Sequence, residues 1–554
     1  MNTLIDNSEK QDMMLNLQLV YVYIESSYSG IGGIELQLGN GVEFHFVRSE
    51  PNLFSMQYYF TKQEVNYITS ADTFFDSNKH LKRLDVLVGE NGTGKTTILN
   101  TIAGVGPIGS WIELFYSYDS QEYYFYSDKN AYKSIEEKAI LEADAYLDNR
   151  KLKKIDLGYR KVYLHLNEYQ PEFLWTTEED QEYKNIMKCD YTSVGRFLFQ
   201  QSLKRQHFNL PCSFTFEIGL LVDEENTTNV IRRKQQIIEC LNDHDEHQAI
   251  EILEELIKRS LEVLHRITIG NPLVSEKELE KKIKNLEKDY QAMIQCLNEI
   301  ADNNTLSIIT HMKHSTSHSA QVANAEKKVN KVNVELGLEF GEWKIENLLM
   351  NFLMIMDNLK INTRIHQFQL IFFRCGFQTM SSGELAYLKL YAEIYCVLKQ
   401  HAQHPGIILL LFDEPEVYMH PEWSRQMISN IVKVITDLYD EHQEWRADCQ
   451  LLITTHTPYL LSDLLPCFIT CIQKGEDNLY ICKGEHSFAA NLYDILNSNF
   501  FVSNPIGEFA LSKLNYMLMQ GEYADAEKYK ELIENIGDEY LRKQLERLLG
   551  DQSW

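Results

Sequence analysis

Residues 89–96 read GENGTGKT, which fits the phosphate-binding pattern GxxxxGK[ST] at every required position. In such a loop, glycines let backbone N–H groups turn inward onto phosphate oxygens at the positive end of a helix dipole. Lys95 can place its cation on the β- and γ-phosphates, and Thr96 can place its hydroxyl on Mg²⁺. The expected nucleotide-binding residues are Gly89, Glu90, Asn91, Gly92, Thr93, Gly94, Lys95, Thr96 and Thr97.

Two carboxylates stand directly after the most apolar stretch of the chain. Residues 407–412 read IILLLF, an unbroken apolar run that predicts a strand buried on both faces, as in the centre of a parallel sheet. Asp413 and Glu414 follow it at the carboxyl end of the sheet, where ligands of open α/β sheets bind. We expect Asp413 to hold Mg²⁺ through water and Glu414 to orient or deprotonate the attacking water.

Two weaker signals complete this set. A turn that precedes a helical stretch is either a second phosphate-binding helix N-terminus or an ordinary N-cap. Its residues are Ser381, Ser382, Gly383 and Glu384, and their place before the acidic strand favours the phosphate site. His456 follows the apolar run 451–453 and two threonines, at the expected end of a strand. A lone His at a strand end is usually structural, but this one stands where a γ-phosphate sensor would.

The surrounding segments predict an α/β fold with antiparallel structure at the N-terminus. Strands are expected at 19–24, 84–88 and 161–166, and hairpins over 34–46, around Asn40-Gly41, and over 111–126. The strand at 84–88 runs into the glycine loop, and a helix is expected over 95–103. The phosphate-binding pattern therefore stands between a strand and a helix, which makes a chance match rare.

A charged helical segment runs from about Asn229 to Asp302. Apolar residues from Leu279 to Ile300 alternate in steps of four and three, a heptad seam, and Ser275 with Glu278 forms a capping box at its start. A partner helix is expected over 232–264. The segment is either a helical hairpin arm that projects from a globular head or a helical subdomain packed on the core. The tail from about Ala510 is also expected to be helical.

Composition excludes several classes of protein. The chain has 554 residues, of which 44% are hydrophobic and 24% charged, as in ordinary globular proteins. The 80 acidic and 53 basic side chains give a net charge of −27, which repels nucleic acids and acidic membranes. The N-terminus lacks the pattern of a signal peptide, and no apolar run could span a bilayer. We expect a cytoplasmic protein without a membrane partner, whose ten cysteines are reduced.

Three further patterns are weighed against simpler interpretations. Cys467, Cys471, Cys482 and His486 could form a zinc site, but a cross-strand pair of buried thiols at Cys471 and Cys482 is simpler. Basic clusters at 150–154 and 232–234 are candidates for local nucleic-acid contact, although such clusters are usually solvated faces. A glutamine that couples Mg²⁺ to a lid is expected between the glycine loop and the helical segment, and Gln170 is the candidate.

In this order, the motifs resemble those of ABC-type ATPase heads: Walker A at 89–96, signature at 381–384, Walker B at 409–414 and switch histidine at His456. The long helical insertion and the phrase from Asp413 to Pro421 are similar to the SMC/RecF branch and to OLD-like ATPases. Ser382 and Glu384 depart from the LSGGQ signature, which suits this branch better than transporters. The resemblance implies ATP and Mg²⁺ as cofactors and a head-to-head dimer. The chain is expected to consist of head halves at 1–228 and 341–483, an insertion at 229–340 and a helical region at 484–554. The apolar residues of this last region either dock a partner or pack on the ATPase head.

Beyond the head, residues 455–458, 486–496 and Phe500-Phe501 resemble the PtuA family of Septu-type and retron-associated anti-phage systems. The resemblance implies a separate HNH-type nuclease, PtuB, as partner and, in retron versions, a reverse transcriptase with its RNA–DNA product. The chain itself shows no nuclease motif. The leading hypothesis is an ATPase whose nucleotide-driven dimerisation controls that nuclease.

Two other hypotheses remain open. A RecF/SMC-like repair ATPase that clamps DNA is disfavoured by the charge of −27, and salt-dependent DNA binding by the isolated protein would revive it. A nucleotide-gated scaffold with little turnover is disfavoured by Glu414, because a protein that only binds ATP needs no base beside the γ-phosphate.

Overall fold

The computed structural model describes about two thirds of the chain, and every structural statement below concerns that part. The described residues are 17–27, 32–39, 42–52, 55–64, 74–75, 79–104, 110–118, 120–127, 153–154, 160–164, 213–220, 227–268, 276–302, 306–309, 334–340, 351–356, 364–365, 368–369, 371–378, 381–403, 405–475, 479–502, 504–519 and 531–550. Gln170, Arg150, Lys151, Ser275 and the predicted loop 311–325 lie outside them.

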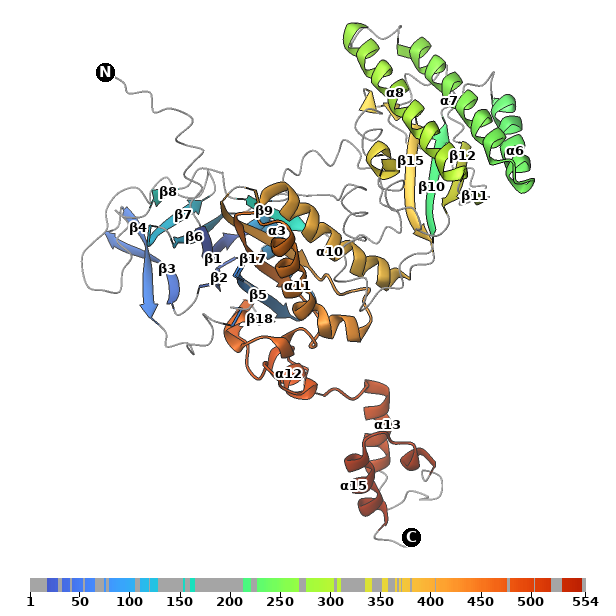
Figure 1. The fold of residues 1–554 in the computed structure, drawn as a ribbon. Coiled ribbons are helices and arrows are strands. Elements are labelled where there is room, and N and C mark those ends of the chain that lie inside the picture. Colours follow the sequence, from blue (N-terminus) through green and yellow to red (C-terminus); the bar gives the residue numbers. More distant parts are fainter. Residues whose placement is uncertain are drawn as a thin grey trace, which may run out of the picture.

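A six-stranded sheet forms the centre of the fold, in the order β19-β18-β5-β17-β16-β9 (Figure 1). Its strands are β5 (Leu81–Gly89), β9 (Arg160–Leu164), β16 (Gly406–Asp413), β17 (Ala447–Thr454), β18 (Ile469–Lys474) and β19 (Leu479–Lys483). All neighbours are parallel except β18 and β19. Every residue of β16 is buried, as the apolar run predicts. Because parallel strands end at one edge, Gly89, Asp413 and Thr454 lie at the same edge of the sheet.

Two hydrophobic clusters hold this sheet between its neighbours. On one face, apolar side chains of the strands pack with those of α10 (Ser382–His401) and α11 (Pro421–Glu441). On the other face, they pack with α3 (Lys95–Ala103) and with β1 (Leu17–Ser26) of a second sheet. The edge that carries Gly89 and Asp413 is therefore built on a rigid, buried scaffold.

The second sheet has the order β2-β1-β6-β7-β8. Its other strands are β2 (Ile34–Gln37), β6 (Ser110–Ser117), β7 (Glu122–Ser127) and β8 (Lys153–Lys154). The hairpin expected over 111–126 is confirmed, since β6 and β7 pair antiparallel. The strand expected at 19–24 is confirmed as part of β1.

The hairpin expected around Asn40-Gly41 is wrong. The strand before this dipeptide, β2, pairs with β1, and the strand after it, β3 (Val42–Asn52), pairs with β4 (Ser55–Glu64). The side chain of Gln37 replaces the missing ladder, because its Oε1 accepts the N–H of Phe44 at 2.9 Å and its Nε2 donates to the Phe44 carbonyl at 2.5 Å. A turn dipeptide thus predicts a change of direction but not which strands pair.

The helical segment comprises α6 (Thr227–Asn242), α7 (Glu246–Thr268) and α8 (Glu276–Ala301) in the described residues. The single partner helix expected over 232–264 is therefore wrong. The first helix ends because His244 has a φ of 60° and the N–H of Asp245 returns to the carbonyl of Cys240. Asp245 then begins α7 as its N-cap, since its side chain accepts the N–H of Gln248 at 3.2 Å.

The three helices lie beside a four-stranded antiparallel sheet, in the order β11-β12-β10-β15, rather than forming a projecting two-helix arm (Figure 1). Its strands are β10 (Ser213–Leu220), β11 (Leu306–Ile309), β12 (Val334–Phe340) and β15 (Ile371–Gln378). The heptad residues from Ile283 to Ile300 are buried, and they share a hydrophobic cluster with α7. The seam is thus the core of a subdomain, the alternative that the sequence left open. The sheet of this subdomain also includes the strands at 213–220 and 371–378. The domain boundaries expected from the sequence remain a prediction.

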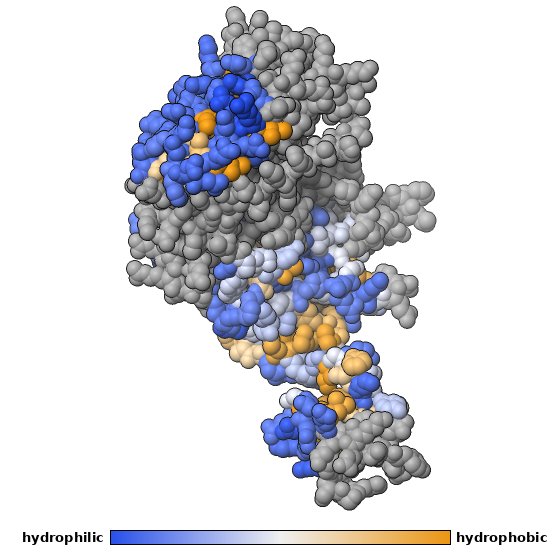
Figure 2. All heavy atoms as spheres, turned by 90° about the vertical axis from the view of Figure 1, so that its right-hand side faces the viewer, coloured by the Kyte–Doolittle hydropathy of each residue, from blue (hydrophilic) through white to orange (hydrophobic). Residues whose placement is uncertain are grey.

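Three described helices follow the central sheet: α12 (Leu492–Asn499), α13 (Glu508–Met519) and α15 (Glu539–Gly550). The last two stand apart from the sheet (Figure 1), and Figure 2 shows hydrophobic residues gathered over the C-terminal part of the molecule. On α13, the side chains of Phe509 and Met519 are 77% and 87% exposed. No helix in the described part of the chain is long and apolar enough to cross a membrane.

Candidate functional site

The glycine loop joins β5 to α3 at the carboxyl edge of the central sheet. Gly94 is the N-cap of α3 with a φ of 84°, a left-handed conformation that glycine adopts without strain, and no side chain caps the helix there. The first N–H groups of α3 are therefore left for an anion. Thr93 closes the loop, because its hydroxyl donates to the carbonyl of Glu90 at 2.9 Å. Glu90, Asn91 and Gly92 are exposed, so the loop opens to solvent.

Lys95 lies within the loop that a phosphate would enter. Its Nζ donates to the carbonyls of Gly89 and Glu90, each at 3.1 Å. Burial lowers the pKa of Lys95, while the charges of Glu414, Asp413 and Glu416 act to raise it. The lysine is thus a buried cation that faces the acidic residues after β16.

Asp413 and Thr96 are in contact, as a shared Mg²⁺ site requires. The Oδ1 atom of Asp413, a residue that is only 1% exposed, accepts the hydroxyl of Thr96 at 3.2 Å and that of Thr454 at 2.6 Å. Thr454 is the register partner of Asp413 across β16 and β17. The hydroxyl and carboxylate oxygens are hard ligands of the kind that Mg²⁺ prefers.

Glu414 is held in a strained conformation beside Asp413. Its φ is 46°, which is uncommon for a residue with a side chain. Its N–H donates to both the carbonyl and the hydroxyl of Thr454, at 3.1 and 3.0 Å, and these bonds stabilise the turn. The strain re-aims the carboxylate, and Oε1 of Glu414 lies 3.0 Å from Nε2 of His456.

His456 is therefore joined to the acidic pair rather than standing alone. Burial lowers the pKa of His456, and the charge of Lys95 lowers it further, against the opposing effects of Glu414 and Asp413. Near neutral pH the ring is thus mainly neutral, and a tautomer with the proton on Nε2 can donate to Glu414.

Glu416 also belongs to this site, although no role was predicted for it from the sequence. It is 6% exposed, and its Oε1 accepts both the hydroxyl of Thr455 and the backbone N–H of His456, the latter at 3.2 Å. Burial, the largest effect, raises the pKa of Glu416 to about 7. The sequence does contain a signal for this residue, because Glu416 is a second glutamate two residues after Glu414. Its hydrogen-bond partners lie about 40 residues away in sequence, so no local pattern connects them to it.

The turn at 381–384 is an N-cap in this structure. Ser381 and Glu384 form a full capping box, in which Glu384 accepts the N–H of Ser381 at 2.7 Å and donates its own N–H to the Ser381 hydroxyl at 3.3 Å. Gly383 is packed so closely that an added Cβ would lie 2.9 Å from the carbonyl of Tyr418. Among the described interactions, none joins residues 381–384 to Lys95, Asp413 or Glu414.

Two other predicted sites are explained by ordinary packing. Cys471 and Cys482 are directly opposite on β18 and β19, which confirms the cross-strand pair, but only Cys471 is buried, so the expected burial of both thiols is wrong. In the parts of the chain that the structure describes, which include all four candidate zinc ligands, no group of three or more ligating residues could hold a metal. In the basic cluster of α6, Arg233 pairs with Glu255 of α7 at 2.8 Å, as on a solvated helix face.

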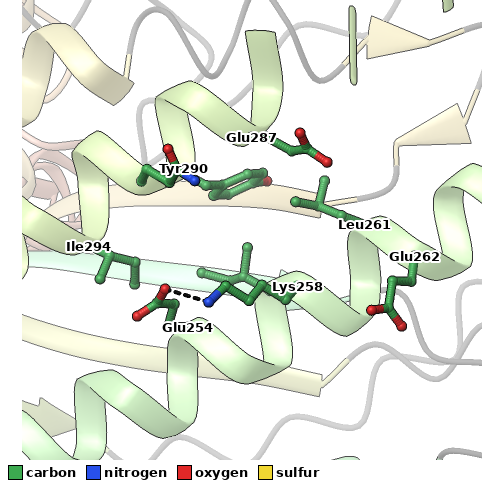
Figure 3. A pocket seen from close by; sticks show the side chains of 9 residues that line it. Glu254, Lys258, Leu261, Glu262, Glu287, Tyr290 and Ile294 are labelled. Carbon is green, nitrogen blue, oxygen red and sulfur yellow. Dashed lines mark ion pairs between the residues drawn. The ribbon is translucent and has the colours of Figure 1, made fainter. Parts of the chain in front are cut away.

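A groove of about 640 Å³ lies between α7 and α8 (Figure 3), and no residue of the glycine loop lines it. Its floor consists of apolar or aromatic side chains that are only 2–7% exposed: Ile257, Leu261, Tyr290 and Ile294. Glu254 and Lys258 form an ion pair of 2.8 Å at its rim. Because so little of the floor is exposed, the groove offers a partner little apolar area to bury.

The fold and the site define an α/β domain in which an uncapped helix N-terminus and a buried lysine face two carboxylates at one sheet edge. Residues 376–462 match the family model described as "AAA domain, putative AbiEii toxin, Type IV TA system". The matched segment contains Ser381, Asp413, Glu414 and His456, whereas the glycine loop precedes it. Domains of this type use a nucleotide with Mg²⁺, and the donors described above fit both.

The Endonuclease GajA of Bacillus cereus (strain HuB5-5) is 24% identical to this chain over 285 residues. The match covers 49% of this chain but only 39% of that protein, so the chain spans less than half the length of this relative. The crystal structure of the SmcHead bound to the C-winged helix domain of ScpA covers 84% of this chain and 97% of its own, at 8% identity and a TM-score of 0.23. A TM-score this low carries no argument about the fold. These matches do not name a Septu-type or retron-associated protein, so that resemblance stays a prediction.

Proposed function

We propose that this chain is the ATP-binding and ATP-hydrolysing subunit of an anti-phage defence system. One observation carries the ATPase part of the proposal: Lys95, Thr96, Asp413, Glu414 and His456, which come from segments far apart in sequence, lie together at one sheet edge. The match to an AAA domain supports the ATPase class, and the similarity to a protein named an endonuclease supports a role connected with nucleic-acid cleavage.

Each residue has a part in hydrolysis that follows from its contacts. Bound MgATP would supply the phosphorus that water attacks and the cation that polarises it. Lys95 would exchange its two loop carbonyls for phosphate oxygens, and Thr96 with Asp413 would hold the cation. Oε1 of Glu414 is held by His456, so its second oxygen is left to take a proton from the attacking water.

The dimeric and partner-controlling parts of the proposal rest on different observations. Residues 381–384 cap their own helix, and none of the described hydrogen bonds or ion pairs joins them to the glycine loop of the same chain, so we expect them to reach a nucleotide across a head-to-head dimer. The exposed apolar side chains of the C-terminal region, among them Leu532 and Tyr540, suit the docking of a separate HNH-type nuclease, PtuB, to the part of the chain after about Gly521. A reverse transcriptase with its RNA–DNA product would join in a retron version.

The ATPase part is tested with Glu414→Gln and Lys95→Ala in the full-length chain. Glu414→Gln should bind ATP normally but turn it over about 10²-fold more slowly, since only the base is lost. Lys95→Ala should weaken ATP binding itself. Glu444→Gln is a matched control, because this exposed residue precedes β17 and therefore lies at the opposite edge of the sheet. Wild-type turnover by the Glu414→Gln protein would show that the base is assigned wrongly.

A further inference from the structure

We propose that Glu416 is a positioning residue that holds His456 against Glu414, an inference that rests on the ATPase function proposed above. Glu416 lies on the loop after β16, and His456 lies on the loop after β17. The two strands remain in register up to Asp413 and Thr454. The backbone pairing of the two strands ends at that residue pair. Beyond it, hydrogen bonds to the Glu416 carboxylate join the two loops.

One oxygen of Glu416 fixes three successive residues of the second loop. Its Oε1 accepts the hydroxyl of Thr455 and, at 3.2 Å, the N–H of His456. The hydroxyl oxygen of Thr455 in turn accepts the N–H of Thr457 at 3.0 Å. Thr455 is fully buried, so this local arrangement has no freedom to rotate into water.

The His456 ring depends on this backbone anchor. Its Nε2 lies 3.0 Å from Oε1 of Glu414, near the best distance for a hydrogen bond. A backbone shift of about 1 Å at His456 would break that contact, and misplacement of this size can cost about 10²-fold in rate. Glu416 would thus act on the base through His456 without touching the nucleotide.

Stability alone does not account for a carboxylate at this position. Among the described residues, the second oxygen of Glu416 has no hydrogen-bond partner although it is buried. Burial also disfavours its charged form, which is why its pKa is raised. A residue kept at such a cost beside a reactive site points to a role in that site.

The test compares Glu416→Ala with Glu416→Gln, whose amide oxygen can still accept both hydrogen bonds. We expect Glu416→Ala to lower kcat for ATP by about 10²-fold while its KM changes by less than about 3-fold, and Glu416→Gln to retain most of the activity. Thr455→Val removes the donor hydroxyl without changing the volume, and Thr455→Ser keeps it. This pair repeats the comparison if the alanine variant does not fold.

A second readout follows the imidazole of His456 by ¹⁵N-histidine NMR, assigned with His456→Gln. Its Nε2 signal should move toward that of a free ring in Glu416→Ala and Thr455→Val, and stay in place in Glu416→Gln and Thr455→Ser. An unchanged kcat and His456 signal in Glu416→Ala, in a protein that hydrolyses ATP through Glu414, would overturn the inference alone. Absence of ATP hydrolysis by the wild-type protein would refute the proposed function, and the NMR signal would still decide whether Glu416 positions His456.

Discussion

The buried carboxyl of Glu416 makes the stability of this protein depend on pH in a predictable direction. Its pKa is raised from the ordinary value of 4.5 to about 7, because burial disfavours the charged form. The folded state therefore binds this proton more tightly than the unfolded state. The contribution to stability is fully present below the unfolded pKa, near 4.5, and is lost as the pH rises through about 7.

The variant Glu416→Gln removes this titration while keeping the size and the acceptor oxygen. A difference of about 2.5 between the two pKa values corresponds to about 3 kcal/mol, at about 1.4 kcal/mol per pH unit. Relative to wild type, the free energy of unfolding of Glu416→Gln should rise by up to about 3 kcal/mol between about pH 5 and about pH 8.

Urea unfolding at matched pH values measures this difference, since pH effects from all other groups are common to both proteins. The variant Glu444→Gln serves as the control, because a backbone hydrogen bond lowers the pKa of this exposed carboxylate, so the variant should show no such rise above pH 5. A difference between Glu416→Gln and wild type that stays constant over this range would refute the reasoning from burial.

Three other predictions concern the insertion, the dimer and the C-terminal region. Leu297→Ala should lower the free energy of unfolding, measured with urea, by about 2–5 kcal/mol, because Leu297 is fully buried among α7 and α8. An effect below about 1 kcal/mol would argue that the heptad residues of α8 do not form a packed core. A mixture of Lys95→Ala and Ser381→Arg chains should recover part of the ATP hydrolysis that each variant lacks alone, because one of the two sites in a mixed dimer is intact. If one intact site suffices for hydrolysis, the absence of recovery in proven mixed dimers would contradict a composite site. Deletion of the residues after about Gly521 should leave ATP binding intact but abolish nuclease co-purification and phage protection. If the truncated chain still co-purifies with the nuclease at full yield, the docking surface lies elsewhere.

Local patterns predicted much of the central sheet. The apolar run 407–412 could only be a strand buried on both faces, and it is the core of β16. The glycine loop required a strand before it and a helix after it, and β5 and α3 occupy those places. In both cases the information lies within about ten consecutive residues, because it is the chemistry of one segment that fixes its conformation.

The pairing of distant segments was not available from such patterns. The sequence predicts strands on both sides of Asn40-Gly41 but gives no reason for β2 to prefer β1, a choice that Gln37 supports with its own side chain. The heptad seam of α8 fits a coiled coil and a subdomain core equally, since each needs only a buried apolar stripe. The sheet beside it combines strands from 213–220, 306–309, 334–340 and 371–378, and no local signal connects them.

The candidate site shows the same division at the scale of single side chains. The sequence draws attention to Asp413, Glu414 and His456, but the residues that set their positions are two threonines at the end of β17. The hydroxyl of Thr454 donates to Asp413 and accepts from the N–H of Glu414, so one side chain positions both members of the acidic pair. Its neighbour Thr455 does the same for Glu416 and Thr457.

These threonines explain how a strained residue can persist at the sheet edge. A non-glycine residue in a disfavoured conformation costs about 1–3 kcal/mol and remains only where its surroundings fix it. Glu414 has a φ of 46°, and its N–H is bound twice by Thr454, whose hydroxyl is itself committed to Asp413. Because Asp413, Glu414 and Thr454 are each hydrogen-bonded to another member of this set, a change at one of them would weaken the bonds that hold the others, so the strained turn depends on the whole network.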